Sequence, residues 1–226
     1  MVNGESSPLR GQFDLSMEQL KRALLVMGQQ VERSIRGSVN ALGQHDMNAA
    51  VTVLSQEADV NRMHHDIDDS CLRLLATEQP VATDLRQIVG TLNVIGQLER
   101  IGDLAVHVAS VAQRLAPEQF SRGMNAIMQM ADDVCAMVGD SLQAFVSQDA
   151  AMAEQVSARD HKVDEVYANI FRDLLSFMME DAGNIAQASS LLFVAKQLER
   201  VGDHSTNICE AVIFVTTGKH VDLNRA

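Results

Sequence analysis

The stretch QLERIGD at residues 97–103 returns almost unchanged as QLERVGD at residues 197–203. The two copies differ only where isoleucine in the first is valine in the second. Upstream of each copy lies a second related pair, EADVN at residues 57–61 and DHKVD at residues 160–164. Self-similarity at a fixed interval is the mark of a repeated structural unit. The sequence therefore predicts two related halves.

The residues around these motifs favour helices throughout. Hydrophobic residues make up 46% of the 226-residue chain, aromatic residues only 4%, and there are three prolines. Alanine and straight-chain residues enter helices at little entropic cost, whereas sheets favour β-branched and aromatic side chains. Apolar residues that recur every three to four positions predict six long amphipathic helices. Their expected ranges are 13–42, 47–76, 81–115, 119–147, 150–179 and 184–217.

The connections between these helices are short. Asp46 and Asp149 are placed to cap the second and the fifth helix. Long helices joined by short loops pack as antiparallel neighbours. We therefore expect an all-α fold of two tandem, related three-helix bundles, with six long antiparallel helices in total. The first bundle is expected at residues 11–116 and the second at residues 117–219.

Charge and cysteine content limit the class of protein. The formal net charge of −12 argues against nucleic acid as a partner, because a phosphate backbone attracts a basic face. Cys71, Cys135 and Cys209 fall within apolar helical patterns, so we expect buried free thiols and a cytoplasmic protein. We expect no secretory signal in the polar residues 1–12, and the apolar run at 211–215 is too short to span a bilayer. Membrane association is therefore expected only through a partner.

Each copy of the repeated motif puts carboxylates where an apolar stripe ends. The stripes are Leu85, Ile88, Leu92 and Ile95 in the third helix, and Ile185, Ala188, Leu192 and Ala195 in the sixth. The next steps of four along each helix give Glu99 and Asp103, and Glu199 and Asp203. Like charges at this spacing repel, and partial burial raises the cost unless something neutralises them. The neutralising group is either a basic side chain, such as Arg100, Arg200 or a neighbouring lysine, or a cation held by carboxylate oxygens.

Other polar side chains are candidates for the same sites. They are Glu57 and Asn61 in the second helix, Asp160 and Asp164 in the fifth, and His107, which continues the first carboxylate row. Residues four apart share a helical face, so each pair could converge with the motif of its own half. The alternatives are a solvated charged face for these pairs and a structural role for the histidine. Gly102 and Gly202 suit a close helix approach beside the carboxylates.

Together with three longer segments, these motifs resemble the PhoU family. The segments are CLRLLATEQPVATDLR at 71–86, FMMEDAGNI at 177–185 and DHSTNICEAVIFVTTGK at 203–219. The similarity extends over residues 11–219, and a doubled Glu-x-x-x-Asp motif is characteristic of the family. The resemblance implies two related three-helix bundles in a cytoplasmic protein that often forms a homodimer.

The resemblance also implies a function and a cofactor. PhoU proteins are negative regulators of the phosphate-starvation response, the Pho regulon, and of phosphate uptake. They act by contact between the ATPase subunit of the phosphate ABC transporter and a membrane sensor histidine kinase. Some hold iron or zinc on the carboxylate motifs, here Glu99, Asp103, Glu199 and Asp203, whereas others carry no transition metal.

Two departures from the repeat concern the first half. Asn61 stands where the second half has Asp164, and His107 stands where it has Asn207. An amide and an imidazole change the charge and the donor set available to a cation. We therefore expect the first-half site to differ from the second.

Two other functions stay open. A di-iron or di-manganese enzyme of the ferritin-like class is also helical and acidic, but it uses Glu-x-x-His pairs. No glutamate of this chain has a histidine three residues later, and there is no nucleophile elbow, P-loop or dinucleotide fingerprint. We therefore expect a protein that is not an enzyme. The remaining alternative is a helical adaptor without phosphate signalling, whose carboxylate rows either bind metal or stay empty.

Overall fold

The computed structural model describes residues 8–115 and 122–224 of the chain. The helices are α1 (Pro8–Gln44), α2 (Met47–Glu78), α3 (Ala82–Leu115), α4 (Met124–Ser147), α5 (Ala150–Ser157), α6 (Asp160–Glu180) and α7 (Ile185–Thr217), with a short 3₁₀ turn η1 (Ala182–Asn184) before α7. These described residues include no strand, and none of their helices combines the length and apolar composition needed to cross a bilayer. The predicted all-α fold is confirmed.

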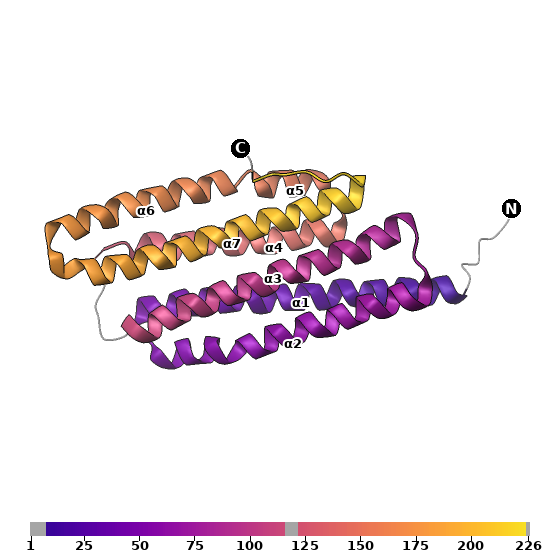
Figure 1. The fold of residues 1–226 in the computed structure, drawn as a ribbon, viewed down its shortest axis with the longest axis horizontal. Helices are drawn as coiled ribbons and strands as arrows, with labels where there is room; N and C mark the ends of the chain where they lie inside the picture. Colours follow the sequence, from indigo (N-terminus) through magenta and orange to yellow (C-terminus); the bar gives the residue numbers. More distant parts are fainter. Residues whose placement is uncertain (1–7, 116–121, 225–226) are drawn as a thin grey trace.

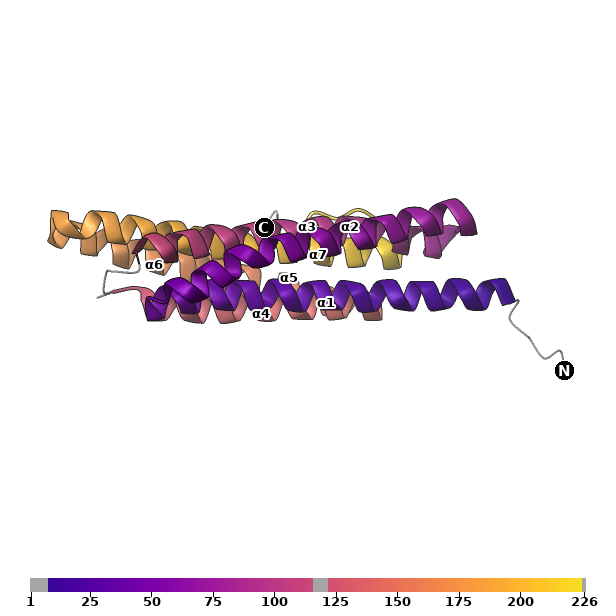
Figure 2. The same ribbon diagram turned by 90° about the horizontal axis from the view of Figure 1, so that it is seen from below.

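The helices lie in two layers, which Figure 2 shows edge-on. One layer contains α1 and α4, and the other contains α6, α7, α3 and α2 side by side in that order (Figure 1). The first three helices pack on one another as one bundle, and the remaining four form the second. The bundles join where α3 contacts α7 and α1 contacts α4. The two helices that carry the repeated motif therefore lie next to each other at the centre of the molecule.

One apolar core runs through both bundles. The stripe on α1 is buried along its whole length, with Leu20, Leu24, Met27, Val31, Ile35 and Val39 at most 4% exposed. All three cysteines are buried free thiols, as predicted. Burial raises the pKa of each thiol to about 12. The cysteines therefore stay protonated near neutral pH and act as small apolar side chains.

Both predicted aspartate caps are present. The carboxylate of Asp46 accepts hydrogen bonds from the backbone N–H groups of Asn48 at 2.9 Å and Ala49 at 3.0 Å. The carboxylate of Asp149 accepts one from the N–H of Met152 at 2.9 Å. Each bond satisfies an N–H group that has no partner inside the helix, which fixes where α2 and α5 begin.

Two helix starts differ by more than one residue from the predicted positions. α1 begins at Pro8, five residues before the expected start at 13, since proline is well suited to a first helical turn. α4 begins at Met124. Its expected start at 119 and the predicted break at 116–117 lie outside the described residues.

The prediction of one continuous fifth helix is wrong, because the chain forms α5 and α6 there. Between them the N–H of Arg159 bonds to the carbonyl of Val156, and the N–H of Lys162 bonds to that of Arg159. These bonds span three residues instead of four and tighten the backbone. The guanidinium of Arg159 also reaches Asp140 on α4, with 2.7 Å between Nη1 and Oδ2. The interruption makes Asp160 the first residue of α6.

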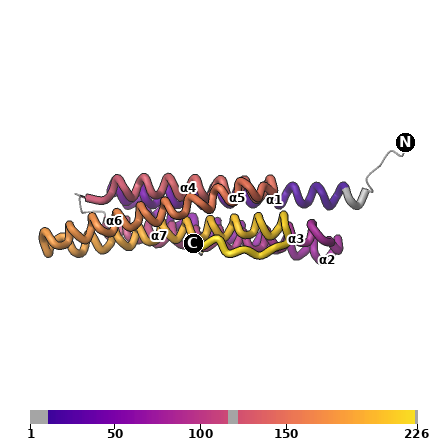
Figure 3. Tube along the Cα trace, turned by 90° about the horizontal axis from the view of Figure 1, so that it is seen from above, coloured from indigo at the N-terminus to yellow at the C-terminus, as the bar shows by residue number. Residues whose placement is uncertain are grey.

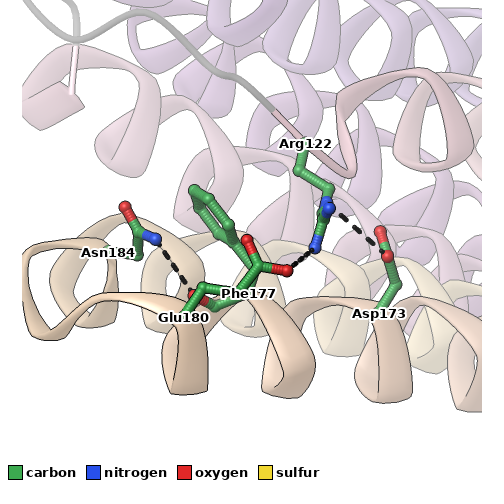
Figure 4. A network of polar contacts seen from close by, with 5 residues as sticks. All are labelled: Arg122, Asp173, Phe177, Glu180 and Asn184. Carbon is green, nitrogen blue, oxygen red and sulfur yellow. Dashed lines mark hydrogen bonds and ion pairs between the residues drawn. The ribbon is translucent and has the colours of Figure 1, made fainter.

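Figure 4 shows the contact that holds the start of α4 against the end of α6. Arg122 donates through Nη1 to Glu180 at 2.8 Å, and its Nε lies 3.8 Å from Asp173. The same guanidinium lies 5.4 Å from the ring centroid of Phe177. Asn184 of η1 donates to the carbonyl of Phe177 at 3.0 Å. These contacts connect three elements at one end of the second bundle.

Candidate functional site

The second-half carboxylates come from two helices that meet at a glycine. Glu199 and Asp203 lie on α7, and Asp160 opens α6; all three side chains are half-buried. A Cβ atom at Gly202 would stand 2.5 Å from Oδ1 of Asp160 and 3.5 Å from Val163. A larger residue at this position would therefore press on α6. The expected role of Gly202 in close helix approach is confirmed.

The apolar stripe that leads into each motif is buried only in part. In α3, Ile88 and Ile95 are fully buried, whereas Leu85 is 41% exposed. In α7, Ile185 at the start of the stripe is likewise 48% exposed. In both helices the exposed member is the first, at the helix start. An apolar stripe predicts a helix face that packs against other helices, and this prediction is wrong at these two positions.

The second-half carboxylates act on one another electrostatically. Burial is the largest cause that raises the pKa of Asp160 from 3.8 to about 6. The charges of Asp203, Asp164 and Glu199 raise it as well, while His161 lowers it. The pKa of Asp203 is also raised, first by burial and then by the charge of Glu199. The structure thus brings Glu199 and Asp164 close enough to Asp160 and Asp203 to disfavour the ionisation of these two aspartates.

One basic side chain neutralises part of this charge. The ammonium of Lys196 lies 2.5 Å from the carboxylate of Glu199, one turn further along α7, and 5.4 Å from the ring centroid of Tyr167. Arg100 and Arg200, which were candidates for this role, are both exposed, and the charge of Arg200 acts in the same direction as Lys196 by lowering the pKa of Asp203. The sequence analysis missed Lys196, although a lysine three residues before a glutamate is a recognised helical pair.

The lysine leaves a buried oxygen unsatisfied. Oδ1 of Asp160 is buried and has no hydrogen-bond partner within residues 8–115 and 122–224. A buried carboxylate oxygen without a partner is costly, and a cation would satisfy it. The surrounding donors are all carboxylate oxygens, which suit a hard divalent cation. No three His, Cys, Asp or Glu side chains of the described chain already form a metal-ligand group, so these side chains must rotate to hold an ion.

The first half repeats the helix contact with different side chains around it. A Cβ atom at Gly102 would meet Val60 of α2 at 3.2 Å. Glu57 is exposed and Asn61 is half-buried on the same helix. The motif residues of α3, Glu99 and Asp103, are half-buried. Glu57 lies on the surface, whereas its counterpart Asp160, the first residue of α6, is half-buried and has its Oδ1 atom buried.

His107 lies at the contact between the bundles. Its ring centroid is 6.4 Å from that of Phe193 on α7. The helix α2, which carries Glu57 and Asn61, lies on the opposite side of α3 (Figure 1). The structure therefore does not bring His107 together with those two candidates.

A second polar contact joins α3 and α7, and sequence reasoning did not find it. The side-chain oxygen of Gln97 lies 2.8 Å from Nδ1 of His204 and accepts a hydrogen bond from Asn207 at 3.1 Å. Burial, followed by the charges of Arg200 and Arg100, lowers the pKa of His204 to about 4. The imidazole is therefore neutral near pH 7, and its Nδ1–H donates to Gln97. The one signal in the sequence is that His204 directly follows Asp203, which places it on a different face of α7 from the carboxylates.

Fold and site together define a class: tandem-repeat, all-helical proteins with a carboxylate motif on the central helix of each half. The family model described as "PhoU domain" matches this chain twice, at residues 24–112 and at residues 127–212. The chain therefore belongs to the PhoU family. One match falls in each half, while the boundaries expected at 11–116 and 117–219 stay predictions.

Relatives resemble the chain over nearly its full length. A phosphate-specific transport system accessory protein PhoU homolog of Clostridium acetobutylicum is 39% identical over 94% of this chain and 97% of its own. The Escherichia coli phosphate-specific transport system accessory protein PhoU is 32% identical over 93% of this chain and 88% of its own. The crystal structure of PhoU from Pseudomonas aeruginosa superposes with a TM-score of 0.86 at 37% identity, over 92% of this chain and 100% of that one. The phosphate transport system regulatory protein PhoU of Streptococcus pneumoniae gives the same TM-score at 28% identity, over 93% and 99%.

Proposed function

We propose that this chain is a regulatory accessory protein of a phosphate transport system, and that it acts as a negative regulator of the Pho regulon and of phosphate uptake. The observation that carries the proposal is the similarity over 94% of the chain to a relative named as an accessory protein of phosphate-specific transport. A second relative, similar over 93% of the chain, is named as a phosphate transport regulatory protein. Similarity of this extent includes both bundles and the contact between them.

In this proposal the protein works by binding partners and is not an enzyme. The partners are the ATPase subunit of the phosphate ABC transporter and a membrane-bound sensor histidine kinase, and the chain reaches the membrane only through them. The net charge of −12 supports docking on a basic face of a partner. We further propose that the protein is cytoplasmic and forms a homodimer.

Loss of the protein should switch on the phosphate-starvation response when phosphate is plentiful. A strain that lacks the gene is expected to express alkaline phosphatase constitutively in high phosphate, because the kinase is no longer restrained. The measurement is alkaline phosphatase activity in high and in low phosphate. The intact chain, supplied from a plasmid, should restore repression. Normal repression in the deletion strain would contradict the regulatory proposal.

We also propose that the second-half carboxylates hold a divalent cation. The site consists of Glu199, Asp203, Asp160 and Asp164. The unsatisfied oxygen of Asp160 and the raised pKa values of Asp160 and Asp203 support it, since both features disappear when a positive charge enters the cluster. A bound ion would neutralise the carboxylates and fix α6 against α7. Glu99 and Asp103 form the corresponding proposed site in the first half, with Glu57, Asn61 and His107 as further candidates.

Removing two charges from the second-half site should remove its metal. The double variant Glu199→Gln and Asp203→Asn is expected to lose half or all of the bound metal while staying folded, because both substitutions keep the side-chain size. The measurement is elemental analysis of protein purified without chelator or nickel resin, together with circular dichroism. The matched control is Asp66→Asn with Asp69→Asn, which removes the same charge from exposed positions on α2. An unchanged metal content in the first variant would exclude these residues from the site.

A further inference from the structure

The antiparallel contact between α3 and α7 carries a groove at each of its ends. One groove, of about 460 Å³, lies between the first part of α3 and the last part of α7, and residues after α7 contribute to its wall. We call it the tail groove. The other, of about 380 Å³, lies between the last part of α3 and the first part of α7. We call it the cationic groove, because His107, Ser110 and Arg114 line its α3 side.

The two grooves are copies of one another. The repeated motif shifts residue numbers by 100, and the same shift carries each residue of the cationic groove onto a residue of the tail groove. On the helix wall that contacts the tail, the pairs are His107 with Asn207, Ser110 with Glu210, and Arg114 with Phe214. On the facing wall, they include Ser189 with Val89 and Phe193 with Asn93. The contacts of the tail along the tail groove therefore show how a chain segment can lie along the cationic groove.

A short segment of the chain itself lies against α7 and forms one wall of the tail groove. After α7 the chain turns at Gly218 and runs back along the helix, as the yellow trace in Figure 3 shows. The ring of His220 stacks on Phe214, with 4.5 Å between centroids and 20° between planes. The N–H of Leu223 donates to Glu210 at 2.8 Å. The segment thus lies antiparallel to α7 and uses positions 214 and 210 in turn.

A third contact completes this arrangement. The side-chain amide of Asn224 donates to the side-chain oxygen of Asn207 at 2.9 Å. Positions 207, 210 and 214 are three and four residues apart and form one row on α7. The groove therefore offers three contacts to a chain segment. Phe214 is a stacking surface, Glu210 accepts from a backbone N–H, and Asn207 accepts from a side chain.

The cationic groove has the corresponding row at positions 107, 110 and 114, and this row carries a positive charge where the row on α7 carries a negative one. Arg114 replaces the ring that the tail stacks on, and Ser110 replaces the glutamate that accepts the tail N–H. The hydroxyl of Ser110 donates to the carbonyl of Val106 at 3.0 Å, which leaves its oxygen lone pairs free to accept. Within the described part of the chain the guanidinium of Arg114 makes no hydrogen bond or ion pair. Among residues 8–115 and 122–224, no acidic side chain lines this groove, although the chain as a whole carries a net charge of −12.

We propose that the cationic groove binds an extended acidic peptide segment of a partner protein. The segment runs antiparallel to the last turns of α3, with a carboxylate on Arg114 at the place where His220 stacks on Phe214 in the other groove. A backbone N–H of the segment donates to Ser110, and a polar side chain meets His107. A carboxylate on a guanidinium makes a charge-assisted hydrogen bond, which favours an acidic segment over a neutral one. This surface is separate from the carboxylate sites, and the proposal requires no role in phosphate signalling.

The test uses a peptide built on the chain's own tail. A labelled seven-residue peptide with the sequence of residues 218–224, carrying His220→Glu, is titrated with the purified full-length protein and followed by fluorescence anisotropy. We expect it to bind at least about tenfold more tightly than the unaltered peptide. We expect Arg114→Glu in the protein to weaken binding of the acidic peptide by a similar factor. The matched control, Arg22→Glu at an exposed position on α1, should leave binding unchanged.

A second variant guards against misfolding of the first. Ser189→Asp places a carboxylate on the facing wall of the groove and should also weaken binding, while circular dichroism confirms the helical content of each variant. Equal binding by Arg114→Glu and the intact protein, or no binding at all, would overturn the proposal. Equal binding of the unaltered peptide would point instead to the tail of a second copy of this chain. Displacement by excess inorganic phosphate at constant ionic strength would point to an anion site and would likewise overturn it.

Discussion

Gly90→Ala should destabilise the fold by about 1–3 kcal/mol, while Gly96→Ala, six residues further along α3, should stabilise it by about 0.5–1 kcal/mol. A Cβ atom at Gly90 would stand 2.5 Å from Val215 and 3.2 Å from Phe145. Both neighbours are buried, at 1% and 2% exposure, and come from α7 and α4. They cannot move without displacing other core side chains, since interiors are close-packed. At Gly96 an added Cβ meets nothing within 4 Å.

The opposite signs separate packing from helix propensity. Alanine is the better helix former at both positions, so propensity alone predicts that both variants gain stability. Urea-induced unfolding, followed by circular dichroism, gives the free energy of unfolding of each variant. A stabilised Gly90→Ala protein would mean that α3 and α7 do not approach as closely as described. A destabilised Gly96→Ala protein would mean that this face of α3 is covered.

Asp160→Asn should make the protein more stable at pH 8 by about 1 kcal/mol and leave its stability nearly unchanged at pH 4. The pKa of Asp160 rises from 3.8 to about 6 on folding, mainly through burial and then through its acidic neighbours. A raised carboxyl pKa means that the folded state holds the proton more tightly than the unfolded chain does. Between pH 3.8 and about 6 the unfolded chain gives up its proton first, so stability falls as pH rises through this window and stays lower above it. Asparagine carries no charge at any of these pH values, so the variant does not lose stability in this window.

The size of this effect is limited by solvent. One pKa unit corresponds to about 1.4 kcal/mol, but the side chain is only half-buried and the neighbouring charges are screened by water, which reduces the figure to about 1 kcal/mol. The measurement is the free energy of unfolding at both pH values, in metal-free buffer. Asp69→Asn, at an exposed position on α2, is the control and should show no pH-dependent gain. If the Asp160→Asn protein is no more stable than the unaltered protein at pH 8, then burial and the neighbouring charges do not disfavour the Asp160 carboxylate.

These predictions rest on features that sequence reasoning found to different degrees. The repeat, the helical class and the buried stripe of α1 follow from local periodicity, because a long amphipathic helix must bury one face wherever it packs. Asp46 and Asp149 were found as caps for the same reason, since a cap bonds only to residues within its own first turn. Leu85 and Ile185 fit the same period and are nevertheless exposed. Periodicity gives the face of a residue, but it does not say whether a neighbouring helix extends that far.

Sequence reasoning named the carboxylates of the candidate site, but it did not find how their charges are neutralised or how their pKa values shift. Spacing along one helix placed Glu199 and Asp203 on a common face. Asp160 directly follows the break before α6, which a tertiary ion pair between Arg159 and Asp140 accompanies. No glycine or proline marks that break in the sequence, so no local pattern signals it.

By itself, the sequence determined that the chain is a duplicated helical protein with acidic motifs at equivalent places, because these properties depend on residues a few positions apart. Only the tertiary structure decided that the copies contact each other along α3 and α7, that Asp160 keeps an unsatisfied buried oxygen, and that the tail forms one wall of a groove. The physical reason is range. Helix formation and capping are settled within a turn or two, whereas desolvation, charge coupling and groove filling depend on which distant surfaces come together.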